Sequence, residues 1–169
     1  ALVKSGADNG FDFKIINSVM EVNESQKLII VDKMKSFYGE SLNGKSIALW
    51  GLAFKPDTDD IREAPALYII DALLAMGCKI KAFDPEAMEN VKFIYGDKVT
   101  FCENQYEALE NSDFLVIATE WQVFRTPDFN KVKELLNENV IFDGRNLYDL
   151  EDMKKLGMRY QSIGRETIN

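Results

Sequence analysis

The sequence has 169 residues, of which 46% are hydrophobic, and its 20 basic and 28 acidic side chains give a formal net charge of −8. This composition excludes a disordered chain, and the acidic balance argues against a nucleic-acid or anionic-membrane partner, whose phosphates need an excess of Lys and Arg. The sequence contains no histidine, which removes Ser-His-Asp and Cys-His catalysis and His-ligated zinc from what this chain can do by itself.

The first predicted element is a long helix over residues 13–38. Apolar residues recur there at spacings of three, four and their sums, and Gly39 follows as a stop signal. A helix of this length extends about 39 Å. It can be a core helix of one domain alone, but few small domains cover so long a helix, so we expect it to have a second packing partner. The periodic residues are Ile16, Val19, Met20, Ile30, Val31, Met34 and Phe37.

After a predicted turn at residues 41–44, short β-rich runs alternate with helical stretches, which is the pattern of βαβ units. Several of the β-rich runs are continuously apolar, as in strands covered on both faces. The expected fold class is therefore α/β, a doubly wound, Rossmann-like parallel sheet of about six strands in the order 3-2-1-4-5-6, preceded by the long helix. The predicted strands are 46–50, 79–83, 99–102, 114–118, 140–143 and 159–163, and the predicted helices are 65–76, 86–93, 106–110, 129–137 and 150–156.

Ligands of such a sheet bind beyond the carboxyl ends of the strands, near the point where strand order reverses. The first strand is followed by a long loop at 51–64 that carries opposed charges. One interpretation is a self-paired polar loop that caps the next helix. The other is that a cation of the loop meets a bound anion. Because the ends of the first and fifth strands would lie about 9.6 Å apart, Lys55 and Arg145, which follow them, are able to converge on one pyrophosphate.

The sequence motif of a dinucleotide-binding turn is incomplete. The first strand is followed by a single glycine, Gly51, where the GxGxxG turn needs three. Asp84 stands where an acidic residue would bind the ribose of NAD, but Asp followed by Pro is favoured as a helix start. Phe54 and Trp121 are aromatic residues that either stack on a base or simply close the core.

The two cysteines, Cys78 and Cys102, fit neither a disulfide scaffold nor a metal knuckle. Both stand beside predicted strands among apolar neighbours, so we expect buried, unreactive thiols in a reducing cytoplasm. No apolar run reaches the length of a membrane span, and the first residues lack the pattern of a signal peptide. The sequence also starts without Met, which suggests a processed product or a fragment.

Residues 51–65, with the sequence GLAFKPDTDDIREAP, closely resemble the carboxyl-terminal domain of the UDP-glucose/GDP-mannose dehydrogenase family. The segments TEW at 119–121 and FDGR at 142–145 recur in the expected order, and VNESQK at 22–27 is similar to the end of the family's central helix. The resemblance covers essentially the whole chain. Within the family, the motifs are most similar to those of members that oxidise UDP-glucose.

The resemblance implies that UDP-glucose is oxidised twice at C6 by two NAD to give UDP-glucuronate. Enzymes of this family have an amino-terminal NAD domain, a central helical region that forms the homodimer, and a carboxyl-terminal domain for the UDP part. Residues 1–42 would be the end of the central helical dimerisation region, and residues 43–169 would be the UDP-sugar-binding domain.

Carried over residue by residue, Phe54, Lys55 and Arg145 would bind the nucleotide sugar, and Arg62 would contact the NAD. The family's catalytic cysteine and its glycine-rich NAD turn would both lie before Ala1. We therefore expect no catalytic residue and no metal ligand in this chain, which alone would bind UDP or a UDP-sugar weakly and oxidise nothing.

Two alternatives stay open. One is a relative of the same fold that acts on UDP-N-acetylmannosamine or GDP-mannose. The other is a non-catalytic dimerisation or binding module.

Overall fold

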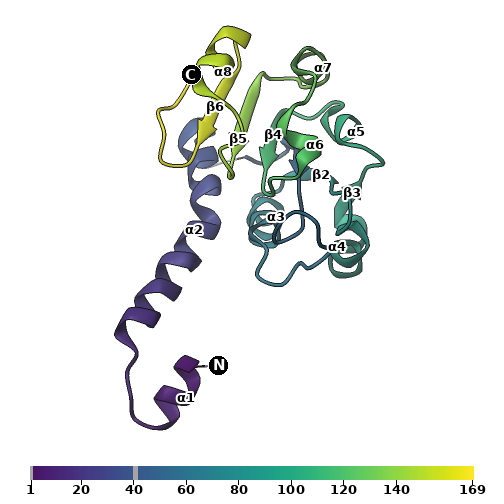
Figure 1. Ribbon diagram of the computed structural model, residues 1–169. Helices are drawn as coiled ribbons and strands as arrows, with labels where there is room; N and C mark the ends of the chain where they lie inside the picture. The colour runs from purple at the N-terminus through teal and green to yellow at the C-terminus, as the bar shows by residue number, and fades with distance from the viewer. Residues whose placement is uncertain (1, 40–41) are drawn as a thin grey trace.

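The computed structural model describes residues 2–39 and 42–169 (Figure 1). Ser41 of the predicted turn lies outside the described residues. The helices are α1 (Leu2–Asp8), α2 (Lys14–Tyr38), α3 (Pro65–Ala75), α4 (Met88–Tyr95), α5 (Gln105–Leu109), α6 (Gln122–Arg125), α7 (Phe129–Leu135) and α8 (Leu150–Leu156), with a 3₁₀ turn η1 (Gly96–Lys98). The strands are β1 (Ser46–Trp50), β2 (Lys79–Phe83), β3 (Val99–Phe101), β4 (Phe114–Ile117), β5 (Val140–Asp143) and β6 (Arg159–Ser162).

The strands of the described residues form one six-stranded parallel sheet in the order β3-β2-β1-β4-β5-β6, which confirms the predicted α/β class and strand order. In the central strand, Ile47 pairs with Ile80 of β2 on one side and with Phe114 of β4 on the other. Strand order reverses between β1 and β4. The carboxyl ends of these two strands therefore flank the place where ligands bind in doubly wound sheets.

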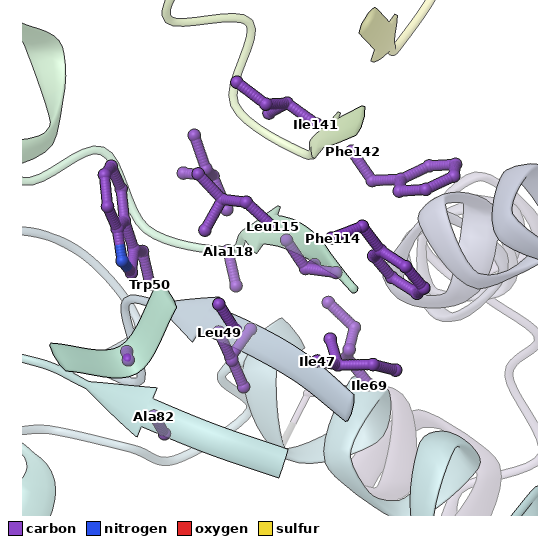
Figure 2. Packing of buried hydrophobic residues seen from close by; sticks show 14 of the residues in the cluster. Ile47, Leu49, Trp50, Ile69, Ala82, Phe114, Leu115, Ala118, Ile141 and Phe142 are labelled. Carbon is purple, nitrogen blue, oxygen red and sulfur yellow. The ribbon is translucent and has the colours of Figure 1, made fainter. Parts of the chain in front are cut away.

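The core lies on both faces of the sheet, and β4 and β5 are buried along their whole length. Figure 2 shows Phe114 and Phe142 beside each other against a neighbouring helix, with their ring centroids 5.2 Å apart. Tyr38, at the end of α2, stacks on Phe114 at 5.0 Å, and Phe37 meets Phe142 edge-on at 5.8 Å. Each such aromatic pair contributes about 0.5–1.5 kcal/mol beyond its buried area. This cluster fixes the carboxyl-terminal end of α2 on the sheet.

Helix α2 confirms the predicted long helix and its end at Gly39. Its buried side chains, Ile30, Val31 and Met34, all belong to its carboxyl-terminal half. The other half projects beyond the sheet toward α1 (Figure 1). The large apolar side chains exposed on that half include Ile15, Val19, Met20 and Val22.

Strand β1 ends at Gly51, whose φ of +91° is in the left-handed region that favours glycine. A Cβ at this position would lie 2.5 Å from Cβ of Thr119, just after β4. The hydroxyl of Thr119 donates to the carbonyl of Ala53 at 2.6 Å. Only glycine allows the ends of β1 and β4 to approach this closely.

The structure differs from the predicted elements in additional helices, in the 3₁₀ turn η1, and in element ends that shift by one or two residues. Helices α1 and α6 are additional, and the four-residue α6 is too short to show a helical period. Helix α4 begins at Met88 rather than at residue 86. The reason is a turn closed by Asp84, whose Oδ1 accepts the N–H groups of Glu86 and Ala87 at 2.9 and 2.8 Å before the regular helix starts.

None of the helices among the described residues has both the length and the apolar character needed to cross a membrane. Over the same residues, His, Cys, Asp and Glu side chains do not gather in groups of three or more that could hold a metal ion.

Candidate functional site

A cavity of about 940 Å³ lies at the carboxyl ends of β4 and β5, between these strand ends and helix α2. Pockets for small ligands measure roughly 300–1,000 Å³, so a nucleotide fits this volume. The structure thus has a ligand-sized cavity at the sheet edge where binding is predicted. Its polar and charged lining residues are Asn23, Glu24, Gln26, Lys27, Glu63, Glu120, Arg125, Arg145 and Asn146.

The guanidinium of Arg145 is fixed in the cavity by two backbone carbonyls. Its Nε donates to the carbonyl of Ala118 at 2.8 Å, and its Nη2 donates to the carbonyl of Phe54 at 3.2 Å. Its own backbone N–H donates to the buried carboxylate of Asp143 at 2.7 Å. Because Ala118 follows β4 and Phe54 follows β1, Arg145 connects three strand ends and needs little reorganisation to meet a ligand.

Glu120 lies directly beside this guanidinium, with its Oε2 at 3.0 Å from Nε of Arg145. The Nε–H group is directed at the carbonyl of Ala118, so this Glu120 oxygen makes an ion contact without a hydrogen bond. The oxygen is buried and has no hydrogen-bond partner among the described residues. The positive charge of Arg145 is therefore largely matched by Glu120 before any ligand arrives.

Phe54 lines the cavity with a side chain that remains 46% exposed. Its backbone N–H donates to the carbonyl of Asp60 at 2.8 Å, which closes the β1–α3 loop. Lys55 is the next residue and is exposed at the same edge, but it is not among the residues that line the cavity. Phe54 and Arg145 are thus brought together directly, and Lys55 is joined to them through the Phe54 peptide.

Arg62 does not line the cavity with Phe54 and Arg145. Its side chain is 87% exposed, and its Nη2 contacts Oδ2 of Asp60 at 2.7 Å. The hydrogen bonds from Arg62 lower the pKa of Asp60 to about 2. For Arg62 the self-paired interpretation of the loop therefore holds, whereas Lys55 forms no ion pair with the residues described.

Asp84 and Trp121 form a buried connection behind the site. Oδ2 of Asp84 accepts the N–H groups of Leu52 and Ala53 at 2.6 and 3.0 Å and the indole N–H of Trp121 at 2.9 Å. Asp84 thus closes its own turn and also holds the turn after β1. The prediction that it caps a helix starting at the next residue is wrong, because α4 begins only at Met88. Trp121 is 7% exposed, so it closes the core and is not available for stacking on a base.

Helix α2 contributes to the cavity through Lys27, which contacts Glu24 at 2.7 Å, Glu63 of the β1–α3 loop, and the hydroxyl of Tyr68 at 2.9 Å. Burial acts to lower the pKa of Lys27, but the hydrogen bonds to Glu24, Glu63 and Tyr68 outweigh it and raise that pKa. Glu63 itself has a φ of +58°, which is rare for a residue with a side chain. The pair with Lys27 therefore fixes a strained loop residue to the helix.

The cysteines take no part in the cavity. Cys78 and Cys102 are free and buried, and burial raises the pKa of each thiol to about 11. Both therefore stay protonated and inert at neutral pH.

Five charged residues of the cavity lining were not predicted as site residues: Glu24, Lys27, Glu63, Glu120 and Arg125. Lys27 and Glu63 are 36 positions apart, so their pairing has no local signal. Glu120 stands in the TEW segment directly after β4, and its place after a strand marked it for attention. Arg125 lies in the same connection after β4. Its position depends on the short helix α6 at residues 122–125, which was not predicted.

Comparisons with known proteins address the same region. The family model described as "UDP-glucose/GDP-mannose dehydrogenase family, UDP binding domain" matches residues 48–150. The chain is 43% identical over 168 residues to UDP-glucose 6-dehydrogenase TuaD of Bacillus subtilis, a match that covers 99% of this chain and 36% of that protein. It is 41% identical over 170 residues to UDP-glucose 6-dehydrogenase of Pseudomonas aeruginosa, which covers 98% of this chain and 38% of that protein.

Among solved structures, the fold is similar to that of a UDP-glucose dehydrogenase from the hyperthermophilic archaeon Pyrobaculum islandicum. The TM-score is 0.79 at 29% identity, over 95% of this chain and 34% of that one. The chain thus spans little more than a third of the length of the relatives it matches.

Proposed function

This chain belongs to the UDP-glucose/GDP-mannose dehydrogenase family, and we propose from that premise that residues 43–169 bind the UDP part of a nucleotide sugar in the cavity beside Arg145. The observation that carries the proposal is the guanidinium of Arg145, which two strand-end carbonyls fix inside a nucleotide-sized cavity. Its position at the carboxyl edge of the sheet, beside the reversal of strand order, is where such folds bind nucleotides.

We assign three residues to the nucleotide sugar. Arg145 supplies fixed N–H donors, and Phe54 supplies an aromatic surface in the cavity wall. Lys55 is exposed and forms no salt bridge in the described part of the chain, although its charge is near enough to Asp60 to help lower the pKa of that carboxyl. Its flexible stem allows its ammonium to reach a phosphate. A diphosphate would attract both cations.

For the longer protein we propose the oxidation of UDP-glucose to UDP-glucuronate with two NAD. The first turn of this chain does not fit NAD. In a dinucleotide-binding turn, backbone N–H groups are free for the pyrophosphate, but here those of Leu52 and Ala53 donate to the buried carboxylate of Asp84. NAD would therefore be bound mainly by another domain, with Arg62 as a contact from this chain.

We also propose that residues 1–42 form part of a homodimer. The amino-terminal half of α2 exposes Ile15, Val19, Met20 and Val22, at 83%, 52%, 53% and 57%. A second helix packed along them would remove this apolar surface from water. We place the protein in a reducing cytoplasm, which suits its two free cysteines.

Isothermal titration calorimetry of the 169-residue chain tests the UDP proposal. We expect UDP and UDP-glucose to bind and GDP to bind more weakly. Tighter binding of GDP than of UDP would favour a GDP-mannose enzyme, and a preference for UDP-N-acetylmannosamine over UDP-glucose would favour that relative. If no nucleotide binds, the UDP proposal fails and the chain is a non-catalytic module.

We expect the 169-residue chain, incubated with UDP-glucose and NAD, to produce no NADH. Its sequence contains no GxGxxG turn, and both of its cysteines are buried with a pKa of about 11. Absorbance of NADH over time is the measurement. A sustained increase that depends on UDP-glucose would contradict the assignment of the chemistry to another part of the protein.

A further inference from the structure

The basic side chains in the cavity wall differ in how their charge is matched. Lys27 contacts two carboxylates, those of Glu24 and Glu63. Arg145 has Oε2 of Glu120 at 3.0 Å from its Nε. Each of these two cations already has an anionic neighbour, so neither brings a full uncompensated charge to a ligand.

Arg125 is the third basic residue that lines the cavity. Within residues 2–39 and 42–169, its guanidinium forms neither a salt bridge nor a hydrogen bond with another side chain. A guanidinium has five N–H donors and stays charged at every physiological pH. Arg125 therefore provides the cavity with an unmatched positive charge and free donors.

The backbone that carries Arg125 is held firmly. Arg125 is the last residue of α6, and Trp121, just before this helix, donates to Asp84 at 2.9 Å. Phe124 is fully buried, and its carbonyl accepts the hydroxyl of Tyr148 at 2.7 Å. The short helix is thus anchored at both ends. These contacts fix the backbone of Arg125 at the cavity.

The two walls of the cavity differ in sign. The wall formed by α2 and the β1–α3 loop carries two carboxylates for one ammonium. The wall formed by the ends of β4 and β5 and by α6 carries two guanidinium groups for one carboxylate. The field inside the cavity therefore directs an anion toward the wall that carries Arg125 and Arg145.

We propose that Arg125 binds the diphosphate of the nucleotide. This inference rests on the proposed function and deepens it, because it adds a residue for the charged part of the ligand to Phe54, Lys55 and Arg145. Arg145, held by two carbonyls and matched by Glu120, acts in this arrangement as a fixed donor more than as the main counter-charge.

Calorimetric titration with UDP and with inorganic pyrophosphate tests the inference on the 169-residue chain. Arg125→Ala is expected to weaken the binding of both probes by roughly tenfold, the usual effect of losing one charge-assisted hydrogen bond. Arg125→Lys retains the charge and should recover part of the affinity. Lys79→Ala removes one positive charge from an exposed side chain at the start of β2, the opposite edge of the sheet, and should leave both affinities unchanged.

The outcomes separate the inference from the proposed function. If the wild-type chain binds UDP and Arg125→Ala binds it equally well, the inference is overturned while the proposed function stands. If the wild-type chain binds pyrophosphate through Arg125 but does not bind UDP, the role of Arg125 in holding a diphosphate is supported, while the proposed function, and with it the nucleotide as the ligand, is overturned. If the chain binds neither probe, or if Lys79→Ala weakens binding as much as Arg125→Ala, the specific role of Arg125 is overturned.

Discussion

The indole Nε1 of Trp121 donates a hydrogen bond to Oδ2 of Asp84 at 2.9 Å, across the end of the central strand of the sheet. Asp84 follows β2 and Trp121 follows β4, and these two strands lie on opposite sides of β1. The same carboxylate oxygen accepts the N–H groups of Leu52 and Ala53, directly after β1. One buried carboxylate therefore holds three strand ends together beneath the proposed ligand site.

We predict that Asp84→Ala lowers the free energy of unfolding by about 3 kcal/mol or more, because several buried N–H donors would lose their acceptor at once. Chemical denaturation with urea measures this. Trp121→Phe removes only one of the donors and should cost about 1–2 kcal/mol. As a control, alanine at the exposed Asp97 should have little effect. A loss at Asp84 no larger than that at Asp97 would contradict the structural role.

The hydroxyl of Tyr160 donates to Oδ2 of the buried Asp143 at 2.6 Å. Burial raises the pKa of Asp143, while the hydrogen bonds from Tyr160 and from backbone N–H groups act in the opposite direction. A carboxyl group with a raised pKa in the folded state favours folding most when it is protonated, so its contribution falls as the pH rises through that pKa.

We therefore predict that Tyr160→Phe destabilises the protein more at about pH 7 than at the lowest pH at which the protein stays folded, because the Tyr160 hydroxyl stabilises the ionised form of Asp143. The expected loss at the higher pH is about 1–2 kcal/mol, measured by urea denaturation at both pH values. Tyr95→Phe is the matched control. Its hydroxyl donates to the exposed Asp71, so this variant shows what a Tyr-to-Phe change costs at each pH when no buried carboxylate is involved. An equal loss for Tyr160→Phe at the two pH values would disprove this coupling.

Cys78 and Cys102 should both resist a thiol reagent in the native protein. Their thiols are buried, and a pKa of about 11 leaves almost no thiolate at about pH 8. Reaction with Ellman's reagent should be negligible in buffer and should reach two thiols per chain in guanidinium chloride. Rapid labelling of either cysteine in the native state would show that its burial is wrong.

The fold was predictable because its signals are local. The strand at 114–117 is a continuous apolar run, which is typical of a strand covered by helices on both faces. Gly39 and Gly77 mark the ends of two helices through their left-handed backbone. Sequential βα alternation then restricts the topology to few choices, and the doubly wound order is one of them.

The charge pairing inside the cavity was not predictable in the same way. Arg145 and Lys55 were selected because they follow strands, and position after a strand predicts which edge a residue occupies. It does not predict that Glu120 lies against the guanidinium of Arg145 or that Arg62 turns to Asp60. These contacts depend on how the side chains and the loops after the strands pack in three dimensions.

The function proposed for this chain depends most on where UDP binds. The most direct measurement is the affinity of UDP for the wild-type chain, for Arg145→Ala and for Lys55→Ala, determined by calorimetry with Lys79→Ala as the charge-matched control. We predict that each of the first two substitutions weakens binding by roughly tenfold or more, since each removes a charge-assisted contact. Unchanged UDP affinity in both variants would contradict the placement of the nucleotide at the ends of β1 and β5.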